Sequence, residues 1–461
     1  MRYLFIVLLL SYSLFANIME LNDVTRTDLE ILNEFDIEPD FLANLELQES
    51  YNNFALKEKD YFIESFNSSL LLIPTVKSIL AKEDVPSVML YVGMAESNFD
   101  IKSHSNMGAK GLWQFIPDTA KKFGLSNDKY IDERLDIEKS TIAASKYLKR
   151  LHNLFGKWYL AAIAYNCGEG RLVEGIVRLS LDKYIEKNPN FEHSQKFKEY
   201  RKVIKNYQNR KNNHNELFKV YREIKSLNID FTLSELLEIQ EITSRQYIPK
   251  ESRNHIRKIV AFAIMLNKEL ELNEQNPHLL NRGMGDMIVS IETNGGFHLK
   301  NIAEASNLSY EDILTLNSHL KQEYIPNNKS KYRIYIPYYA LQTYHENKNN
   351  IKPTILQKHI VKQGDSLNKI SSLYGISSSY IQEFNNLKSD KIKPNQELLI
   401  PFKEGTKIVV KKTKQKEYIV QKGDTLSTIA LKQKVSLKKL MGDNKLNSSN
   451  ISIGDKLVIN N

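Results

Sequence analysis

Apolar residues recur with helical spacing through most of the first 270 residues of the chain. Residues at i, i+3, i+4 and i+7 share one face of a helix, whereas strands alternate apolar and polar residues. Between about residues 83 and 176 no long alternation of that kind interrupts the helical pattern. One apolar stripe consists of Ala144, Leu148, Leu151 and Phe155, and a second helix is predicted from Trp158 to Ala164. We therefore expect a mainly helical domain here.

A glutamate stands on the apolar face of a helix predicted from Val85. Met89, Val92 and Glu96 share that face with Val85 at 100° per residue. Burial disfavours the charged form of a carboxyl group, which is how a glutamate can be kept protonated as a general acid. Carboxylates near helix ends are also often solvated or paired with a cation, so this pattern alone leaves both interpretations open.

Residues 17–82 also carry apolar positions at helical spacing, interrupted by Pro39 and Pro74. We expect helices there that pack onto the domain that follows. Helical pattern resumes from Leu233 to Ile239 and from Ile256 to Leu266.

The C-terminal part contains a repeat. The segment from His359 aligns without a gap on the segment from Tyr418, at a constant offset of 59 residues. Each copy predicts a short strand, a Gly-Asp turn, two short amphipathic helices and a closing strand, hence a βααβ module. The corresponding pairs include Gly364 and Gly423, Asp365 and Asp424, Asn385 and Asn444, and Ile400 and Ile459.

A third, weaker copy begins near Met287. Leu299, Ile313 and Asn317 align with Leu367, Ile381 and Asn385, but Gly296-Phe297-His298 replaces the Gly-Asp-Ser/Thr turn. Because the turn chemistry differs, we expect this copy to pack against the helical domain rather than bind a ligand.

The length of the chain predicts the number of domains, and its N-terminus indicates where the protein is located. A chain of 461 residues predicts two to four domains. Arg2, the apolar run from Leu4 to Leu10 and a small-residue stretch ending near Ala16 have the outline of a secretory signal peptide. Leu14 stands three residues before a cut after Ala16, where a small residue is usual, so an uncleaved anchor stays open.

The cysteine count and the net charge further limit the kinds of site and partner that this protein can have. The single cysteine, Cys167, rules out an intrachain disulfide and a cysteine-based structural zinc site. The net charge of +9 suits a polyanionic partner, and the signal peptide argues against nucleic acid. These features are typical of an exported bacterial envelope protein.

Three segments resemble the motifs of soluble-lytic-transglycosylase domains, whose fold is that of goose-type lysozyme. They are Glu96-Ser97-Asn98-Phe99, the loop from Ser105 to Pro117, and Ala164-Tyr165-Asn166-Cys167-Gly168-Glu169-Gly170-Arg171. The segments 132–136 and 248–253, and C-terminal units resembling LysM modules, are similar to the membrane-bound lytic murein transglycosylase D branch. The resemblance implies a multidomain protein, with a mainly α goose-lysozyme-like catalytic domain followed by small α+β (βααβ) LysM modules.

The family's activity follows from one carboxylate. Ordinary glycosidases use two carboxylates, but Glu96 is the plausible one here, and we expect Asp100 to be a solvated or capping residue. One carboxylate suffices if the 6-hydroxyl of N-acetylmuramic acid is the nucleophile, giving a 1,6-anhydro end. A lysozyme-like hydrolase and a catalytically inert peptidoglycan-binding protein are the alternatives.

The resemblance also implies roles for other residues. Ser105 would orient the acid or the 6-hydroxyl, Gln114 would bind an N-acetyl group, and Ile116 would form apolar wall. Tyr165 and Asn166 would lie near the glutamate, and Glu251 would contact substrate. The LysM residues expected to bind glycan are Gly364, Asp365, Ser366, Asn385, Gly423, Asp424, Thr425 and Asn444. We expect no metal and no cofactor.

The chain departs from the family at four places. Cys167 replaces an alanine, His255 replaces the usual tyrosine, and no lipobox cysteine follows the signal segment. The Lys-, Asn-, Glu- and Tyr-rich stretch 181–228 looks like an insertion, either a solvated charged helix or hairpin or a basic surface touching wall polymer.

These inferences give a domain plan and a location. The predicted parts are a signal peptide (1–16), an N-terminal helical segment (17–82), a lytic transglycosylase domain (83–275), a degenerate LysM-like module (285–338) and two LysM modules (358–402 and 416–460). The expected partners are peptidoglycan glycan strands, in the periplasm or cell envelope and without a lipid anchor. Membrane association through an uncleaved N-terminal segment stays open.

Overall fold

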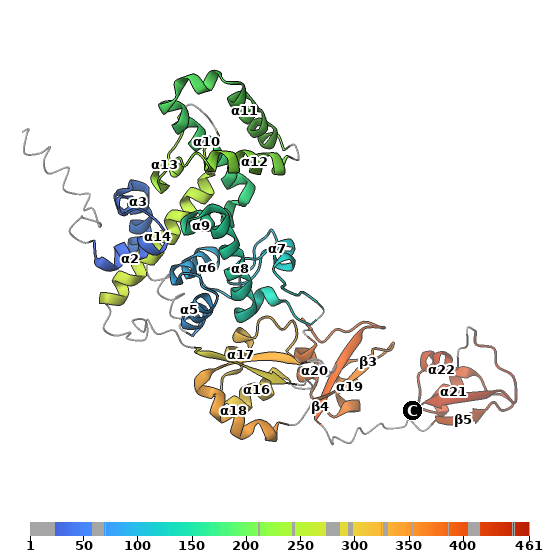
Figure 1. Cartoon of the computed structure of the whole chain (residues 1–461). Helices are drawn as coiled ribbons and strands as arrows, with labels where there is room; N and C mark the ends of the chain where they lie inside the picture. Colours follow the sequence, from blue (N-terminus) through green and yellow to red (C-terminus); the bar gives the residue numbers. More distant parts are fainter. Residues whose placement is uncertain are drawn as a thin grey trace, which may run out of the picture. The chain divides into compact units, whose positions relative to one another are not determined.

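Helices make up the N-terminal part of the computed structural model, as the apolar spacing predicts (Figure 1). The structure describes residues 24–57, 69, 71–128, 130–210, 213–241, 245–272, 286–293, 298–323, 325, 331–351, 354–385, 387–403, 415–444, 446 and 448–460. The helices are α2 (Arg26–Glu34), α3 (Leu45–Lys57), α5 (Leu72–Lys82), α6 (Leu90–Ser97), α7 (Pro117–Lys122), α8 (Ile137–Phe155), α9 (Trp158–Cys167), α10 (Glu169–Lys187), α11 (Gln195–Gln208), α12 (His214–Lys225), α13 (Leu233–Leu237) and α14 (Lys250–Leu272).

Helix α14 is the element around which the helical part is packed. It contacts α2, α3, α6 and α9, and Ile256, Ile259 and Val260 on it are fully buried. The N-terminal helices α2 and α3 both contact α14. The predicted signal peptide (1–16) and residues 17–23, 58–68 and 70 of the predicted N-terminal helical segment lie outside the described residues.

Helices α8 and α9 form where they are predicted. The stripe of α8 is buried, with Ala144, Leu148 and Leu151 at 0% exposure. Asp136 caps the start of α8 by accepting a hydrogen bond from the Lys139 amide, and Gly156, at φ +85°, ends it.

The helix predicted from Val85 begins later than expected. A 3₁₀ turn spans Ser87–Met89 and α6 starts at Leu90. Pro86 explains the difference, because proline lacks an amide hydrogen and disfavours helical backbone at the residue before it. Asn98, at φ +51°, ends α6 two residues after Glu96.

The charged stretch 181–228 is helical, and two of its helices, α11 and α12, pack against each other. Its helices are not simply solvated, because Tyr200, Ile204, Leu217 and Val220 are buried. This stretch therefore adds to the core of the helical part.

Three βααβ modules follow, each with an antiparallel pair of strands. The first contains β1 (Ile288–Thr293), α16 (Leu299–Ser306), α17 (Tyr310–Leu316) and β2 (Tyr332–Pro337), and is followed by α18 (Leu341–Asn347). The second contains β3 (Thr354–Ile360), α19 (Leu367–Tyr374), α20 (Ser378–Phe384) and β4 (Glu397–Lys403). The third contains β5 (Gln415–Ile419), α21 (Leu426–Lys432), α22 (Leu437–Asp443) and β6 (Lys456–Asn460).

The chain divides into two compact units, Met1–Ile351 and Lys352–Asn461. The first βααβ module belongs to the first unit and packs onto the helices, as expected from its altered turn. Leu320 pairs with Ile131 in a β-bridge, and the Asp132 amide donates to the His319 carbonyl at 2.8 Å. The second unit contains the other two modules, each with its own core. In the described part of the chain, no helix has the length and apolar character needed to cross a membrane.

Candidate active site

Glu96 lies in the last turn of α6, against α14. Its side chain is 17% exposed, and its Oε1 atom lies 3.2 Å from Nε2 of His255 on α14. One turn further along α14, the Lys258 ammonium donates to the Ala95 carbonyl at 3.1 Å. The end of the helix that carries Glu96 is thus fixed on α14 by two side chains.

His255 has an unusual environment for a histidine. Its side chain is 11% exposed. Both ring nitrogens are buried, and within the described residues neither forms a hydrogen bond of good geometry. An unsatisfied buried polar group costs about 1–3 kcal/mol. Among the described residues, the charged partner that the structure gives this ring is the Glu96 carboxylate.

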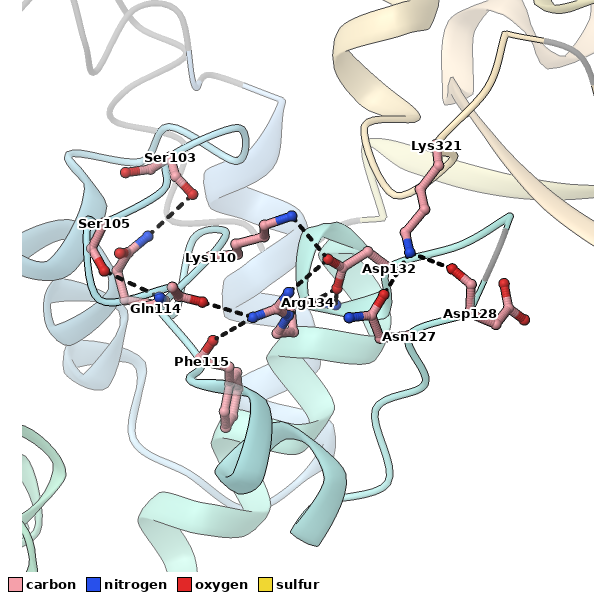
Figure 2. A network of polar contacts seen from close by, with 12 residues as sticks. Ser103, Ser105, Lys110, Gln114, Phe115, Asn127, Asp128, Asp132, Arg134 and Lys321 are labelled. Carbon is pink, nitrogen blue, oxygen red and sulfur yellow. Dashed lines mark hydrogen bonds and ion pairs between the residues drawn. The ribbon is translucent and has the colours of Figure 1, made fainter. Parts of the chain in front are cut away.

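The loop after α6 carries Ser105 and Gln114 and is closed by its own hydrogen bonds. The Ser105 amide donates to the Ala109 carbonyl at 2.9 Å, and the Ser105 hydroxyl accepts from the Ala109 amide at 3.1 Å. The Gln114 side-chain amide donates to the Ser103 carbonyl at 3.3 Å (Figure 2). It also donates to the Gly111 carbonyl at 2.8 Å.

The backbone of Gln114 is held in a strained conformation. Its φ of +46° lies in the left-handed region, which a residue with a Cβ rarely adopts. Such strain persists where the surrounding structure over-determines it, and it is commonly found at functional sites. The hydrogen bonds of the Gln114 side chain to Gly111 and Ser103 supply part of that constraint.

Arg134 connects this loop to the segment 127–136. Its guanidinium donates to the carbonyls of Gly108 at 2.8 Å and Phe115 at 3.4 Å, at the two sides of the loop (Figure 2). The same guanidinium binds both oxygens of Asp132, at 2.9 Å and 2.8 Å. A Cβ at Gly111 would lie 2.0 Å from the Arg134 carbonyl oxygen, so this contact requires glycine.

Asp132 is the buried counter-charge of that arginine. Its side chain is 1% exposed and also lies 3.2 Å from the Lys110 ammonium. Burial acts against ionisation, but the hydrogen bonds and charges of Arg134 and Lys110 hold the pKa of Asp132 below its ordinary value. The carboxylate therefore stays charged and keeps the loop in place.

The third motif meets the loop through Tyr165. Its phenol donates to the Trp113 carbonyl at 2.8 Å. Burial, and secondly the charge of Glu96, raise the pKa of Tyr165 well above its ordinary value. The phenol is thus neutral and lies close enough to Glu96 to be influenced by it. Asn166, next in the chain, accepts a 2.6 Å hydrogen bond from the Ser252 hydroxyl on α14.

The remaining residues of the motifs differ in exposure. Ile116 is 47% exposed, and Trp113 is fully buried, where its indole donates to Thr141 at 3.0 Å. Glu251 is exposed in the first turn of α14, and the described residues supply no ion pair to it. Asp100 is exposed and accepts the Lys102 amide at 2.8 Å, which confirms it as a turn residue.

Two features of this region are not evident from the sequence: the contact between His255 and Glu96, and the buried Glu174. His255 was visible as a departure from the family, but its distance from Glu96 was not. Glu174, fully buried, binds Arg171, Arg178 and Arg245. Arg171 in turn donates to the Gln246 and Tyr247 carbonyls, which holds the segment that leads into α14. Cys167 is a free thiol whose pKa is raised to about 11 by burial.

The Gly-Asp turns of the second and third βααβ modules have the same structure. Gly364 and Gly423 have φ of +90° and +91°, and the carboxylates of Asp365 and Asp424 accept the amides of Lys362 and Gln421. Ser366 and Thr425 cap α19 and α21. The side-chain amides of Asn385 and Asn444 join the second helix of each module to its closing strand, and Asn317 does the same in the first module.

The two cavities described next lie away from Glu96. A cavity of about 500 Å³ lies between the ends of α8, α9, α10, α12 and α13, and one of about 380 Å³ between α5, α8 and β1; the lining of neither includes Glu96. No cluster of three His, Cys, Asp or Glu side chains suited to a metal ion occurs in the described part of the chain.

Comparison with known protein families shows which domains this chain contains. Residues 75–178 match the transglycosylase SLT domain, and 359–401 and 418–460 match the LysM domain. Residues 288–353 match the LysM-like domain of lytic transglycosylase MltD. The chain thus carries a transglycosylase SLT domain, an MltD-type LysM-like domain and two LysM domains, which confirms the resemblance found in the sequence.

Individual proteins are similar to this chain over different lengths. The membrane-bound lytic murein transglycosylase D of Escherichia coli K12 is 24% identical over 392 residues, covering 82% of this chain and 74% of that protein. A tributyltin chloride resistance protein described as putative, from Alteromonas sp. strain M-1, is 38% identical over 96 residues, 21% of this chain and 46% of that protein. The N-acetylmuramoyl-L-alanine amidase sle1 of Staphylococcus saprophyticus is 37% identical over 99 residues, 22% of this chain and 30% of that protein.

Proposed function

We propose that this protein is a peptidoglycan lytic transglycosylase that cleaves the bond between N-acetylmuramic acid and N-acetylglucosamine without water and leaves 1,6-anhydro ends. The observation that carries the proposal is Glu96 in the SLT domain, paired with His255 and near Tyr165. The Glu96 carboxylate lies 3.2 Å from the His255 imidazole, and its charge acts on the Tyr165 phenol. A mechanism with one carboxylate fits that environment.

In the proposed reaction Glu96 acts first as acid and then as base. The protonated carboxyl gives its proton to the glycosidic oxygen, and the bond between C1 of the muramic acid and that oxygen breaks. The 6-hydroxyl oxygen of the same sugar bonds to C1, and its proton passes to the Glu96 carboxylate. Glu96 is then protonated again, and one glycosidic bond has been exchanged for an internal one.

Attack by the sugar's own hydroxyl avoids the entropy cost of recruiting a separate nucleophile. In well-oriented intramolecular reactions that term reaches roughly 7–11 kcal/mol. The substrate must be held accurately for this gain, which is the role we assign to the loop and to α9.

The substrate contacts follow the family motifs. Ser105 would orient the 6-hydroxyl or the acid, and Ile116 would form apolar wall. The amide nitrogen of Gln114 donates to two loop carbonyls, which leaves its oxygen to accept from an N-acetyl N–H. Asn166 has its oxygen bound to Ser252, which leaves its nitrogen to donate to sugar. Glu251, exposed at the start of α14, would contact glycan further along the strand.

The two LysM modules would hold the enzyme on its polymer. Gly364, Asp365 and Ser366, and the matching Gly423, Asp424 and Thr425, form turns that would bind glycan. Asn385 and Asn444 would support the glycan-binding surface by fixing the second helix of each module to its closing strand. Two weak sites on one polymer raise the local substrate concentration for the catalytic domain.

The domain plan and location are also proposals. We assign residues 1–16 to a signal peptide, 17–82 to supporting helices, 83–275 to the catalytic domain with the helical insertion 181–228, 285–338 to the LysM-like module, and 358–402 and 416–460 to the LysM modules. Export to the periplasm would bring the enzyme to its substrate. The E. coli relative is named as membrane-bound, and here an uncleaved N-terminal segment would be the corresponding attachment.

Digestion of purified sacculi, with mass spectrometry of the released muropeptides, tests the proposal. We expect anhydro ends from the wild type and a loss of release in Glu96→Gln. Reducing ends would instead indicate a lysozyme-like hydrolase, and sedimentation with sacculi without release would indicate an inert binding protein. Anhydro products from Glu96→Gln at the wild-type rate would contradict the role of Glu96.

A further inference from the structure

We propose that a row of cations on α11 binds the carboxylates of the peptides that peptidoglycan carries, beside the glycan strand that the enzyme cuts. The row, called the α11 stripe here, consists of Lys198, Arg201, Lys202 and Lys205. The inference rests on the proposed function, because it places a second part of the same polymer on the surface of the helical insertion.

The α11 stripe occupies one face of its helix. Its four residues are spaced i, i+3, i+4 and i+7, and all four are exposed. The opposite face carries Tyr200 and Ile204, which are buried, and α11 packs against α12 (Figure 1). At a rise of about 1.5 Å per residue, the stripe spans roughly 10 Å along the helix. It is a linear row of positive charge that faces solvent.

The described residues do not neutralise the stripe. Among them, no carboxylate forms an ion pair with any of its four cations. Glu223 on α12 is engaged by other groups, since it lies 2.9 Å from the Lys196 ammonium and accepts from the Tyr200 phenol at 2.8 Å. Glu199, at the edge of the stripe, accepts from the Gln195 side chain at 3.3 Å. The positive charge of the stripe is therefore available to a ligand.

The charge of the chain is concentrated in this insertion. Residues 181–228 carry twelve Lys and Arg and six Asp and Glu, a net charge of +6 (12 − 6), against +9 for the whole chain. Like charges four residues apart weaken a helix, so the stripe adds nothing to the stability of α11. An anionic ligand explains this face of the helix, whereas the packing of the protein does not.

The insertion joins the helical part next to the third motif. A Cβ at Gly170, in the first turn of α10, would lie 2.7 Å from the hydroxyl oxygen of Tyr207, in the last turn of α11. Gly170 follows Asn166, which we place at the substrate, by four residues. Lys205 precedes Tyr207 by two residues, so one end of the stripe lies within a helical turn of this contact. A polymer bound at the third motif thus has the stripe close to it.

The chemistry of the exposed face selects the kind of anion. A helix that binds a membrane surface places an apolar face among the lipids, but the apolar face of α11 is packed inside the protein. Peptidoglycan carries short peptides with free carboxylates along each glycan strand, and this chain contains an SLT domain and LysM domains. Lysine is a point charge on a flexible stem, which suits carboxylates whose positions vary. The stripe adds several weak contacts to the same polymer.

The test compares triple variants of the full chain for binding to purified sacculi by sedimentation at low salt. All carry Glu96→Gln, so that turnover does not remove the ligand. The stripe variant has Lys198→Gln, Lys202→Gln and Lys205→Gln. The control loses the same charge from exposed lysines of α7, α8 and α16, through Lys122→Gln, Lys146→Gln and Lys300→Gln.

We expect the stripe variant to bind about ten-fold more weakly than the Glu96→Gln parent, because each exposed ion pair changes affinity by a factor of roughly 1.5 to 5, and the control to change less than about two-fold. Arginine at the same three stripe positions keeps the charge and should bind like the parent. Thermal unfolding of each variant shows whether the fold is kept. At 1 M salt, where the Debye length is about 3 Å instead of about 10 Å at 0.1 M, the difference should shrink.

Two further ligands identify the anion. In the first, the carboxyl groups of the sacculi are converted to methylamides with a carbodiimide and methylamine. The parent, the control and the stripe variant should then bind alike, because the charges that the stripe recognises are gone. The second ligand is a vesicle of phosphatidylglycerol and phosphatidylcholine, to which the stripe variant and the control should also bind alike.

The outcomes separate the inference from the proposed function. Equal binding of the stripe and control variants to untreated sacculi would overturn the role of the stripe, and so would a difference that persists on the methylamide sacculi. A difference seen only with vesicles would assign the stripe to an anionic membrane instead. A chain with Glu96 intact that releases no anhydro-muropeptides would contradict the proposed function, and the binding comparison does not depend on that release.

Discussion

The phenol of Tyr335, in the closing strand of the LysM-like module, donates a 2.6 Å hydrogen bond to Asp136, the residue that caps α8. Arg333 on the same strand lies 3.0 Å from Glu138, in the first turn of α8. Burial and Asp136 raise the pKa of Tyr335 far above its ordinary value, so it remains a donor. The module thus supports the segment from which Arg134 reaches the loop from Ser105 to Pro117.

Removing that phenol should weaken the contact. Tyr335→Phe loses a hydrogen bond to a charged acceptor, and we expect the free energy of unfolding to fall by about 1.5–3 kcal/mol. Denaturant unfolding of the full chain measures it. Tyr339→Phe is the matched control, because Tyr339 is 68% exposed and should change stability by less than about 0.5 kcal/mol. Equal stability of the two variants would mean that the bond contributes nothing.

Arg134→Lys tests whether the loop must be held by a guanidinium. Lysine keeps the charge but cannot bind Asp132 through two nitrogens while reaching the Gly108 and Phe115 carbonyls. Since small displacements of positioning groups are costly, we expect kcat/KM for anhydro-muropeptide release to fall about ten- to a hundred-fold. Lys122→Ala, an exposed change in α7, should leave the rate unchanged. A wild-type rate in Arg134→Lys would show that the reaction does not require a guanidinium at this position.

Gly111→Ala and Gly108→Ala form a matched pair. Both glycines have positive φ, +78° and +81°, so each alanine costs roughly 1–2 kcal/mol in backbone strain. A Cβ at Gly108 meets nothing within 4 Å, whereas at Gly111 it would lie 2.0 Å from the Arg134 carbonyl oxygen. Chemical denaturation should therefore show a clearly larger loss of stability for Gly111→Ala. Equal losses would show that the loop and Arg134 separate easily.

Asp424 should make the second LysM module sensitive to acid. The Lys432 ammonium, then the Gln421 amide and the Tyr418 phenol, lower the pKa of Asp424 to about 2. A depressed pKa contributes stability above the unfolded value of about 3.9, and that contribution is lost as the pH falls through about 2.

Asp424→Asn should accordingly increase hydrogen exchange of strands β5 and β6 at neutral pH, with the difference from wild type shrinking in acid. Exchange mass spectrometry of the full chain, corrected for intrinsic rates, measures this. Asp443→Asn is the control, since that carboxylate is exposed in the same module. An equal response of both variants would show that the Asp424 contacts do not matter.

Much of the fold could be read along the chain, because the signals were local. The apolar stripe of α8, the run of α9 and the 59-residue repeat each depend on residues close in sequence. The apolar spacing predicts a helix from Val85, but the local effect of Pro86 delays the start of α6 to Leu90. The buried face of α11 and α12 could not be foreseen, since it depends on helices that are distant in the sequence.

The sequence by itself determined the class of the protein, because the residues from Glu96 to Pro117 and the paired Gly-Asp turns form contiguous motifs. Tertiary structure alone decided which groups surround the glutamate. His255 is 159 residues from Glu96 along the chain (255 − 96), and Tyr335 is 199 residues from Asp136, yet both pairs are in contact. Such contacts are created when helices and modules pack, and no local pattern records them.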